Sequence, residues 1–358
     1  MNRPILHVTA RDGRVLPVVD VTHPAFRLDL DDTAQRALLA DFVAQDEPLA
    51  RLPGFLRRVL LRVVLRGSVL ARGLRAARGS YLGAIETYLL KLRPEDLGPW
   101  AAPVDRRILA ALPAVAVRLR LQDMARLMAD ALAPRLRAAP GRPLLFLDLA
   151  GGTAIDALNA LLVLRREVPE LLERAVAIDV LDRDRDGPEL GARLLDALQG
   201  EGAPLHGTSV ALRHVPWDWA TGGATLSAAT TGARASGAIT IAASEGGLFE
   251  YGGDDEIVDA LGRLGDGDLV AVVGSVTRAD LPVRRLHRDG GAAIRPRGLE
   301  AFRALVATVG WTVDHAVERP FSDHVRLLPT APRRAGTWGS GHASSSQSSP
   351  ASSPNFTA

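Results

Sequence analysis

From residue 143 onward, short apolar runs alternate with segments in which apolar residues recur every three or four positions. The short runs predict buried strands, and the periodic segments predict helices. We expect strands at 144–149, 175–181, 209–215, 238–243, 268–275, 311–317 and 323–328, and helices near 154–167, 188–199, 254–264 and 297–309. This alternation is typical of α/β proteins and predicts a mostly parallel sheet with helices on both faces.

The last two predicted strands are joined only by residues 318–322, with no helical pattern between them. A parallel connection needs a crossover of about a dozen residues or more. We therefore expect an antiparallel hairpin, so that a seven-stranded and mostly parallel sheet ends in an antiparallel last strand.

The N-terminal part of the chain has a different pattern. Residues 1–24 form short extended pieces, 31–45 have the apolar period of a helix, and 104–137 indicate further helix with a break at Pro113. We expect a helical N-terminal cap over 1–135, an α/β domain over 136–330, and a disordered tail over 331–358, which is rich in Ser, Pro, Gly and Ala.

Residues 51–79 contain eight arginines and no acidic residue. One interpretation is a basic amphipathic helix that binds an anionic membrane surface or nucleic acid. The other, which we favour, is an arginine-rich solvated face on a helix of the cap. Glycines at 67, 73 and 79 interrupt the pattern, and aromatic residues that could stack on bases are nearly absent.

Composition narrows the class of protein. The chain has 358 residues, is 47% hydrophobic and carries a net charge of +2, which does not by itself indicate a nucleic-acid partner. The absence of cysteine excludes disulfides, thiolate metal sites and cysteine nucleophiles, and suits a reducing compartment. Neither a signal peptide nor an apolar run of about 18 residues is found. We expect a cytoplasmic protein without a bound metal.

The most informative stretch is 144–160, where a predicted buried strand ends at Asp148, a turn of small residues follows, and a helix begins. Ala150, Gly151 and Gly152 in the turn let a ligand approach the backbone, and the helix offers free N–H groups. A strand, a tight turn and a helix form the first half of a doubly wound nucleotide-binding fold. An ordinary strand-to-helix turn is about equally compatible with these residues alone.

The glycine spacing disfavours two nucleotide motifs. The dinucleotide fingerprint G-x-G-x-x-G fits neither from Gly151 nor from Gly152, and the Gly-Lys-Ser/Thr of a phosphate loop is absent. An NAD-dependent oxidoreductase is therefore the least favoured alternative.

The turn resembles motif I of the class I S-adenosylmethionine-dependent methyltransferases, which is an acid, one residue and then G-x-G-x-G. Asp148 takes the place of the acid, and Ala150, Gly152 and Ala154 take the places of the three glycines. The resemblance covers about residues 140–330. It implies a Rossmann-like fold and S-adenosyl-L-methionine as the cofactor.

After the next two predicted strands, acidic residues occur at the places where the same family has them. In the family, an acid at the end of the second strand accepts hydrogen bonds from both ribose hydroxyls, a geometry that suits two carboxylate oxygens. We favour Asp182 for this role, with Asp179 and Asp184 as alternatives; a solvated acidic loop is the other interpretation. After the third strand, the resemblance implies that Asp218 accepts from the adenine amine beside Trp217 or Trp219.

The stretch after the fourth strand, 244–251, is SEGGLFEY. It resembles the corresponding stretch of small-molecule O-methyltransferases and leucine carboxyl methyltransferase-like proteins, and open α/β sheets bind ligands at this edge. The resemblance implies the following cofactor-binding residues: Asp148, Ala150, Gly151, Gly152, Asp182, Asp218, Trp219, Ser244, Glu245 and Arg120.

A sulfonium methyl donor is already a strong electrophile, so the protein mainly has to align it with the acceptor and exclude water. A base is needed only when the acceptor is a hydroxyl or a protonated amine. The candidates are His287, Glu245, Glu250 and Tyr251, although His287 lies in a basic loop where a plain surface role is the alternative.

Residues ahead of the turn provide further candidates. Arg118 or Arg120 is the candidate cation for the methionyl carboxylate, unless the turn backbone binds that group. If the cap folds over the carboxyl edge of the sheet, Tyr81, Tyr88 and Lys91 would line the acceptor pocket.

The function that we expect is methyl transfer to a small molecule, such as a secondary metabolite, with an O-methyl product as the first choice. One alternative is a catalytically inactive interaction protein with a methyltransferase fold. Another is a methyltransferase that acts on nucleic acid or at a membrane through the arginines of 51–79.

Overall fold

The computed structural model describes residues 3–50, 67–77, 80–280, 283 and 293–330. The expectations for the tail after 330, for His287 and for most of the arginine-rich stretch lie outside the described residues. No helix among the described residues is long and apolar enough to cross a membrane.

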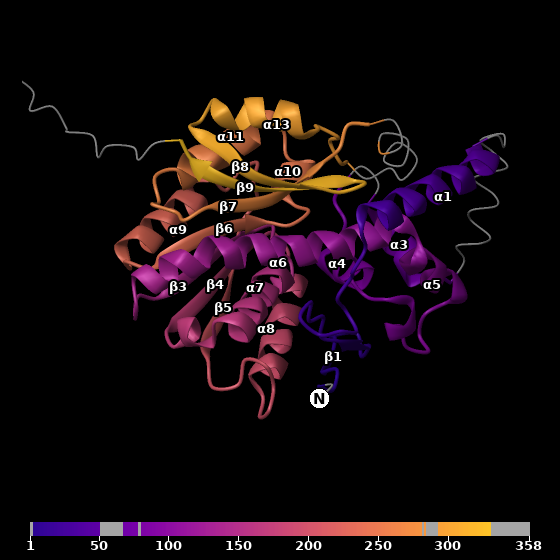
Figure 1. The fold of residues 1–358 in the computed structure, drawn as a ribbon, viewed down its shortest axis with the longest axis horizontal. Coiled ribbons are helices and arrows are strands. Elements are labelled where there is room, and N and C mark those ends of the chain that lie inside the picture. Colours follow the sequence, from indigo (N-terminus) through magenta and orange to yellow (C-terminus); the bar gives the residue numbers. More distant parts are fainter. Residues whose placement is uncertain (1–2, 51–66, 78–79, 281–282, 284–292, 331–358) are drawn as a thin grey trace, which may run out of the picture.

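The N-terminal part combines a small antiparallel sheet with a group of helices (Figure 1). The elements are β1 (His7–Thr9), β2 (Val15–Pro17), α1 (Asp32–Ala50), α3 (Val69–Ala76), α4 (Ala84–Leu90), the short 3₁₀ helix η1 (Pro94–Asp96), α5 (Pro103–Ala110) and α6 (Leu112–Ala138).

The remaining described residues form an α/β arrangement. The strands are β3 (Leu144–Leu149), β4 (Ala175–Asp182), β5 (Ser209–Pro216), β6 (Ile239–Ser244), β7 (Val272–Thr277), β8 (Trp311–Glu318) and β9 (Ser322–Pro329). The helices are α7 (Ile155–Glu167), η2 (Pro169–Leu172), α8 (Asp186–Gln199), α9 (Gly223–Ala235), α10 (Leu248–Tyr251), α11 (Asp254–Leu264) and α13 (Leu299–Ala307).

These seven strands form one sheet in the order β5-β4-β3-β6-β7-β9-β8. Neighbours from β5 through to β7 pair in parallel, whereas β9 is antiparallel to both β7 and β8. The predicted fold class, a mostly parallel seven-stranded sheet with an antiparallel last strand, is confirmed. Because β3 lies between β4 and β6, the chain reverses its direction of winding at the end of β3, where such sheets bind ligands.

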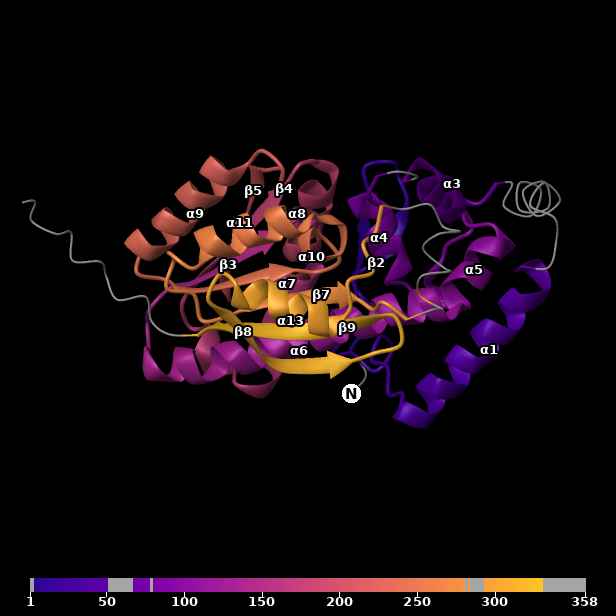
Figure 2. The same cartoon turned by 90° about the horizontal axis from the view of Figure 1, so that it is seen from above.

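Both faces of the sheet are covered, which explains the nearly continuous apolar run of β3. Leu144 and Phe146 pack with residues of α6, α7 and α8, whereas Leu145 and Leu147 pack with residues of α9, α11 and α13. Helices α6, α7 and α8 therefore cover one face of the sheet, and α9, α11 and α13 cover the other. Figure 2 shows α1, α3, α4 and α5 of the N-terminal part beside this arrangement, to the right of the strands.

Helix α6 connects the N-terminal helices to the sheet. Its second residue is Pro113, which is tolerated in a first turn because the missing N–H has no partner there. The break predicted at Pro113 is therefore the boundary between α5 and α6. From this start, α6 runs for 27 residues and packs on α7, β6, β7 and β9 (Figure 1).

Some elements differ from the sequence-based predictions. Helix α9 was not predicted because its sequence, GATLSAATTGARA, is rich in weak helix formers. Strand β7 begins at Val272 and not at 268, since Asp268 has a positive φ of 53°, which breaks the extended conformation.

Candidate active site

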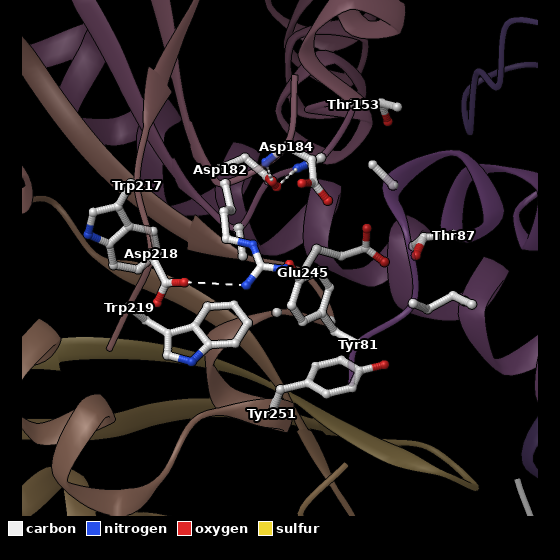
Figure 3. A pocket seen from close by; sticks show the side chains of 18 of the residues that line it. Tyr81, Thr87, Thr153, Asp182, Asp184, Trp217, Asp218, Trp219, Glu245 and Tyr251 are labelled. Carbon is white, nitrogen blue, oxygen red and sulfur yellow. Dashed lines mark hydrogen bonds and ion pairs between the residues drawn. The ribbon is translucent and has the colours of Figure 1, made fainter. Parts of the chain in front are cut away.

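A pocket of about 270 Å³ lies where the carboxyl ends of β3, β4, β5 and β6 meet helix α4. Figure 3 shows Asp182 and Asp184 on one wall, Trp217, Asp218 and Trp219 on the next, and Tyr81 with Tyr251 opposite. The turn after β3 provides the floor with residues 150–153. The N-terminal and sheet parts of the chain therefore build this pocket together.

The turn after β3 has three residues in the left-handed conformation: Ala150 (φ 52°), Gly152 (φ 55°) and Ala154 (φ 52°). These are the three positions that the sequence resemblance equates with motif glycines. The left-handed conformation costs a residue with a Cβ atom about 1–2 kcal/mol, so two alanines keep a conformation that glycine adopts freely. The N–H of Ala150 donates to the carbonyl of Leu181 at 2.7 Å, which ties the turn to β4.

Asp182 ends β4 and lies beside the turn. Its Oδ2 accepts from the N–H of Gly152 and its Oδ1 from the N–H of Asp184, each at 2.9 Å. Burial raises the pKa of Asp182, against the effect of these two hydrogen bonds. The carboxylate is thus held in place with lone pairs left for a ligand that brings hydroxyl donors. Asp179, the earlier alternative, is instead paired with Arg213.

The wall formed after β5 is aromatic and polar. Oδ1 of Asp218 accepts from the N–H of Ala220 at 2.9 Å, and Oδ2 lies 3.6 Å from a guanidinium nitrogen of Arg183. Arg183 lies 4.7 Å over the ring of Tyr81, which meets Trp219 edge-on with 5.8 Å between ring centroids. The hydroxyl of Tyr81 is buried without a partner among the described residues. An orphaned hydroxyl beside two aromatic rings suits a flat, polar-edged ligand.

A cluster of buried charges forms one side of the pocket, whose lining includes Lys91 and Glu245. Glu245 accepts from Nζ of Lys91 at 2.5 Å and from Nε of Arg120 at 2.8 Å. Arg120 also donates to Glu250 at 3.1 Å, and Ser275 donates to the same carboxylate at 2.9 Å. Burial alone would raise the pKa of Glu245, but Lys91 and Arg120 lower it. A carboxylate held in the ionised form by two cations is a weak proton acceptor, so the geometry favours a counter-charge role for Glu245.

Asp148 lies under the turn and is fully buried. Neither of its oxygens has a donor among the described residues, and its neighbour is a second carboxyl, Asp156. Burial, followed by the charge of Asp156, raises the pKa of Asp148 well above its ordinary value; burial also raises the pKa of Asp156 to about 6. We infer that the pair retains a proton in the folded protein, because an ionised and unpartnered carboxylate would be costly to bury.

Several candidate residues lie away from the pocket. The Tyr88 hydroxyl donates to the carbonyl of Pro17 at 2.7 Å inside the core. Arg118 donates to the carbonyls of Leu92 and Leu109. Oγ of the buried Ser244 accepts from the N–H of Leu248 at 3.0 Å, and this hydrogen bond fixes the start of α10. These three side chains hold the backbone around the pocket and do not line it.

A second pocket, of about 370 Å³, adjoins the first and shares Leu82, Thr87, Gly246 and Tyr251 with it. Burial, and then the charge of Glu250, raises the pKa of Tyr251 to about 12, so its hydroxyl keeps its proton at neutral pH and is a poor base. The lining of this pocket is mainly apolar and includes Leu74, Leu90, Ile108, Val117, Ile294 and Phe321.

The structure adds residues that the sequence did not single out. Thr87 lies on the shared wall of the two pockets, and Arg183 bridges Asp218 and Tyr81. Arg183 had a signal, since it directly follows Asp182 at the end of a predicted strand. In the part of the chain that is described, no group of three or more His, Cys, Asp or Glu side chains could hold a metal ion.

Comparisons with known proteins agree with this fold. No family model matches the chain, and no curated protein is significantly similar to it. The structure is similar to that of a possible exported protein from Bordetella parapertussis (20% identity, TM-score 0.54, 84% of this chain and 100% of that chain covered). It is less similar to mitomycin 7-O-methyltransferase (15% identity, TM-score 0.38, 83% and 75% covered) and to N,N-8-amino-8-demethyl-D-riboflavin dimethyltransferase from Streptomyces davawensis (13%, 0.36, 75% and 71%).

The strand order defines the class of fold. Five parallel strands with β3 at the centre, followed by a hairpin whose second strand inserts next to β7, form the Rossmann-like fold of class I methyltransferases. The pocket lies at the edge of the sheet where this fold binds its ligands.

Proposed function

We propose that this protein transfers a methyl group from S-adenosyl-L-methionine to a small-molecule acceptor. The observation that supports this most strongly is the pocket at the ends of β3, β4 and β5. It combines a left-handed turn, an acid at the end of β4 and an aromatic wall after β5. These three features suit the phosphate-free nucleoside part of this cofactor, because they offer a close backbone approach, an acceptor for hydroxyl donors and a flat apolar wall.

The residues present fit the cofactor. In our proposal, Asp182 accepts from the ribose hydroxyls, and Asp218, Trp219 and Tyr81 surround the adenine. The unpartnered Tyr81 hydroxyl and the free lone pairs of Asp182 are the groups that the nucleoside would satisfy. The methionyl carboxylate would lie toward Lys91 and Arg120, whose positive charges Glu245 and Glu250 balance in part.

The bound cofactor supplies an electrophilic methyl group, and the chain's own residues orient the acceptor and exclude water. The second pocket is the proposed acceptor site, because it adjoins the first through Thr87, Gly246 and Tyr251. Its apolar lining favours a hydrophobic small molecule. An O-methyl product in secondary metabolism remains our preferred outcome. We also propose that residues 1–135 form a substrate-binding cap on the domain that follows.

Calorimetry with S-adenosylhomocysteine tests the cofactor site directly. We expect micromolar binding to the wild-type protein. Asp182→Ala should weaken it about 10- to 100-fold, because two hydrogen bonds to a charged group are lost. Asp255→Ala changes an exposed acid on α11 that does not line the pocket; it is the matched control and should bind as the wild type does. Equal binding by both variants, or no binding by the wild type, would contradict the proposal.

A further inference from the structure

A buried chain of hydrogen bonds joins α6 to the start of β9. Oδ2 of Asp123 lies 2.9 Å from Nδ1 of His324, and Nε2 of His324 lies 3.0 Å from Oγ of Ser322. His324 is completely buried, and the other two residues are nearly so. Only Ser322 reaches the apolar second pocket, where it forms part of the wall.

The positions of these residues in the sequence explain how their side chains meet. Ser322 and His324 are two residues apart on β9, so both side chains point to the face that α6 covers. Asp123 meets them from α6, and Arg319, in the short connection between β8 and β9, holds it through two hydrogen bonds of 2.7 and 2.9 Å.

The hydrogen-bond partners fix where the protons are. Burial alone would raise the pKa of Asp123, but hydrogen bonds from His324 and Arg319 lower it, so Asp123 is ionised and accepts from Nδ1–H. Nε2 of a neutral imidazole is then the acceptor, and Ser322 donates to it. The lone pairs of the Ser322 oxygen are left facing the pocket. This is the arrangement of a general base that acts through a hydroxyl.

We propose that Ser322, His324 and Asp123 form a proton relay that deprotonates a hydroxyl acceptor in the second pocket. The relay rests on the proposed function, because it serves methyl transfer at that pocket. It also names the class of acceptor: an apolar small molecule with an acidic hydroxyl, such as a phenol.

The proton balance is simple. The acceptor O–H bond breaks and its proton passes to Oγ of Ser322, while the Ser322 proton passes to Nε2 of His324. The acceptor oxygen keeps the electron pair and becomes the nucleophile, and Asp123 balances the charge of the imidazolium. Because His324 has no exposed surface, the proton returns through Ser322 after the product leaves.

The charged groups around His324 are consistent with this role. Asp123 and Arg120 face it from α6, and Arg319 faces it from the connection between β8 and β9. Its partners in the sheet, Ser275 on β7 and Val317 on β8, carry no charge. Burial lowers the pKa of His324 although Asp123 opposes this effect, so the imidazole is neutral near pH 7 and its Nε2 keeps the lone pair that the relay requires.

A test that needs no natural acceptor uses 4-nitrophenol, whose neutral and ionised forms differ in absorption. The probe is bound to the full chain in the presence of S-adenosylhomocysteine, and its ionisation is followed against pH. We expect the wild-type protein to ionise the bound probe about one pH unit lower than Ser322→Ala or His324→Gln, a tenfold difference in acidity.

Two further variants make the test specific. Ser322→Thr keeps the hydroxyl and should behave as the wild type. Thr277→Val removes a hydroxyl that lies in the wall of the same pocket but outside the relay, so the bound probe should ionise at the same pH as in the wild type. If Ser322→Ala and His324→Gln ionise the probe like the wild type, or if the wild type does not bind it, the relay is refuted. Calorimetry on the same samples separates the two proposals, since each variant should bind S-adenosylhomocysteine normally.

Discussion

Lys91, which caps the C-terminal end of α4, and Glu245, which directly follows β6, form an ion pair with 2.5 Å between Nζ and Oε2, and each side chain is only 4% exposed. The two residues are 154 positions apart in the sequence. They join the N-terminal helices to the carboxyl edge of the sheet, and both line the proposed cofactor pocket.

Lys91→Met should lower the free energy of unfolding by about 3 kcal/mol, because removing one partner of a buried pair leaves the other charge poorly compensated. Urea denaturation measures this change. Arg126→Met is the matched control, since Arg126 and Glu167 form an ion pair in which both side chains are nearly half exposed. That variant should lose less than about 1 kcal/mol. Equal losses would show that the buried pair contributes no more than the exposed one.

The carboxyl pair under the turn should make stability depend on pH. The pKa values of Asp148 and Asp156 are raised by folding, so the folded protein holds protons that the unfolded chain releases. The contribution of this pair to stability therefore falls as pH rises from the unfolded value, near 3.8, through about 6.

In Asp148→Asn, the side-chain amide can donate a hydrogen bond toward Asp156, but it does not titrate. Relative to the wild type, the variant should gain stability, and the gain should be larger near pH 8 than near pH 5. Urea unfolding at the two pH values measures the difference. Asp323, with a pKa raised by burial to about 6, is present in both proteins and cancels in the comparison. A gain that does not change with pH would argue against a proton retained by this pair.

Trp219→Ala should weaken the binding of S-adenosylhomocysteine. Stacking of a base on an aromatic side chain contributes about 1–3 kcal/mol, which corresponds to a loss of about 5- to 150-fold. Trp100→Ala removes an indole that packs under Arg14 outside the pocket, and it should leave calorimetric affinity unchanged. If Trp100→Ala weakened binding more than Trp219→Ala, the adenine would not stack on Trp219.

Ala150→Gly should stabilise the fold by up to about 1 kcal/mol, because glycine adopts the φ of 52° without a steric cost. Gly202→Ala provides the calibration. Its φ is 72°, and a Cβ atom there would meet nothing within 4 Å, so its loss of stability reports the conformational cost alone. Thermal unfolding of the two variants should show shifts of opposite sign.

The sequence predicts the sheet well because each strand is bounded by turn residues. Strand β3 occupies the predicted 144–149, since Pro143 precedes its apolar run and small residues follow it. Asp182 was correctly expected at a strand end for the same reason. Helix α9 escaped prediction because tertiary packing, and not the propensity of its Gly and Thr residues, makes it helical.

The charged and hydrogen-bonded groups were harder to foresee. Asp123 and His324 are 201 positions apart, and nothing in their local sequences indicates that they meet. Likewise, the sequence makes Lys91 and Arg120 candidates for the ligand pocket but does not indicate that both pair with Glu245, which follows only from how the α4 and α6 segments pack. Local patterns predict elements, whereas the pairing of buried polar groups depends on how the elements pack.

Helix α6 limits how this protein can be recombined with others. One face of it presents Arg120 to the charge cluster and, a turn later, Asp123 to the relay. A chimera that takes a foreign N-terminal segment up to residue 135 would lose both side chains, so Glu245 would lack Arg120 and His324 would lack Asp123. Exchanging acceptor specificity by grafting therefore calls for a junction near Ala111, so that the whole of α6 stays with the strands it covers, and for a lysine in the foreign segment that takes the place of Lys91 beside Glu245.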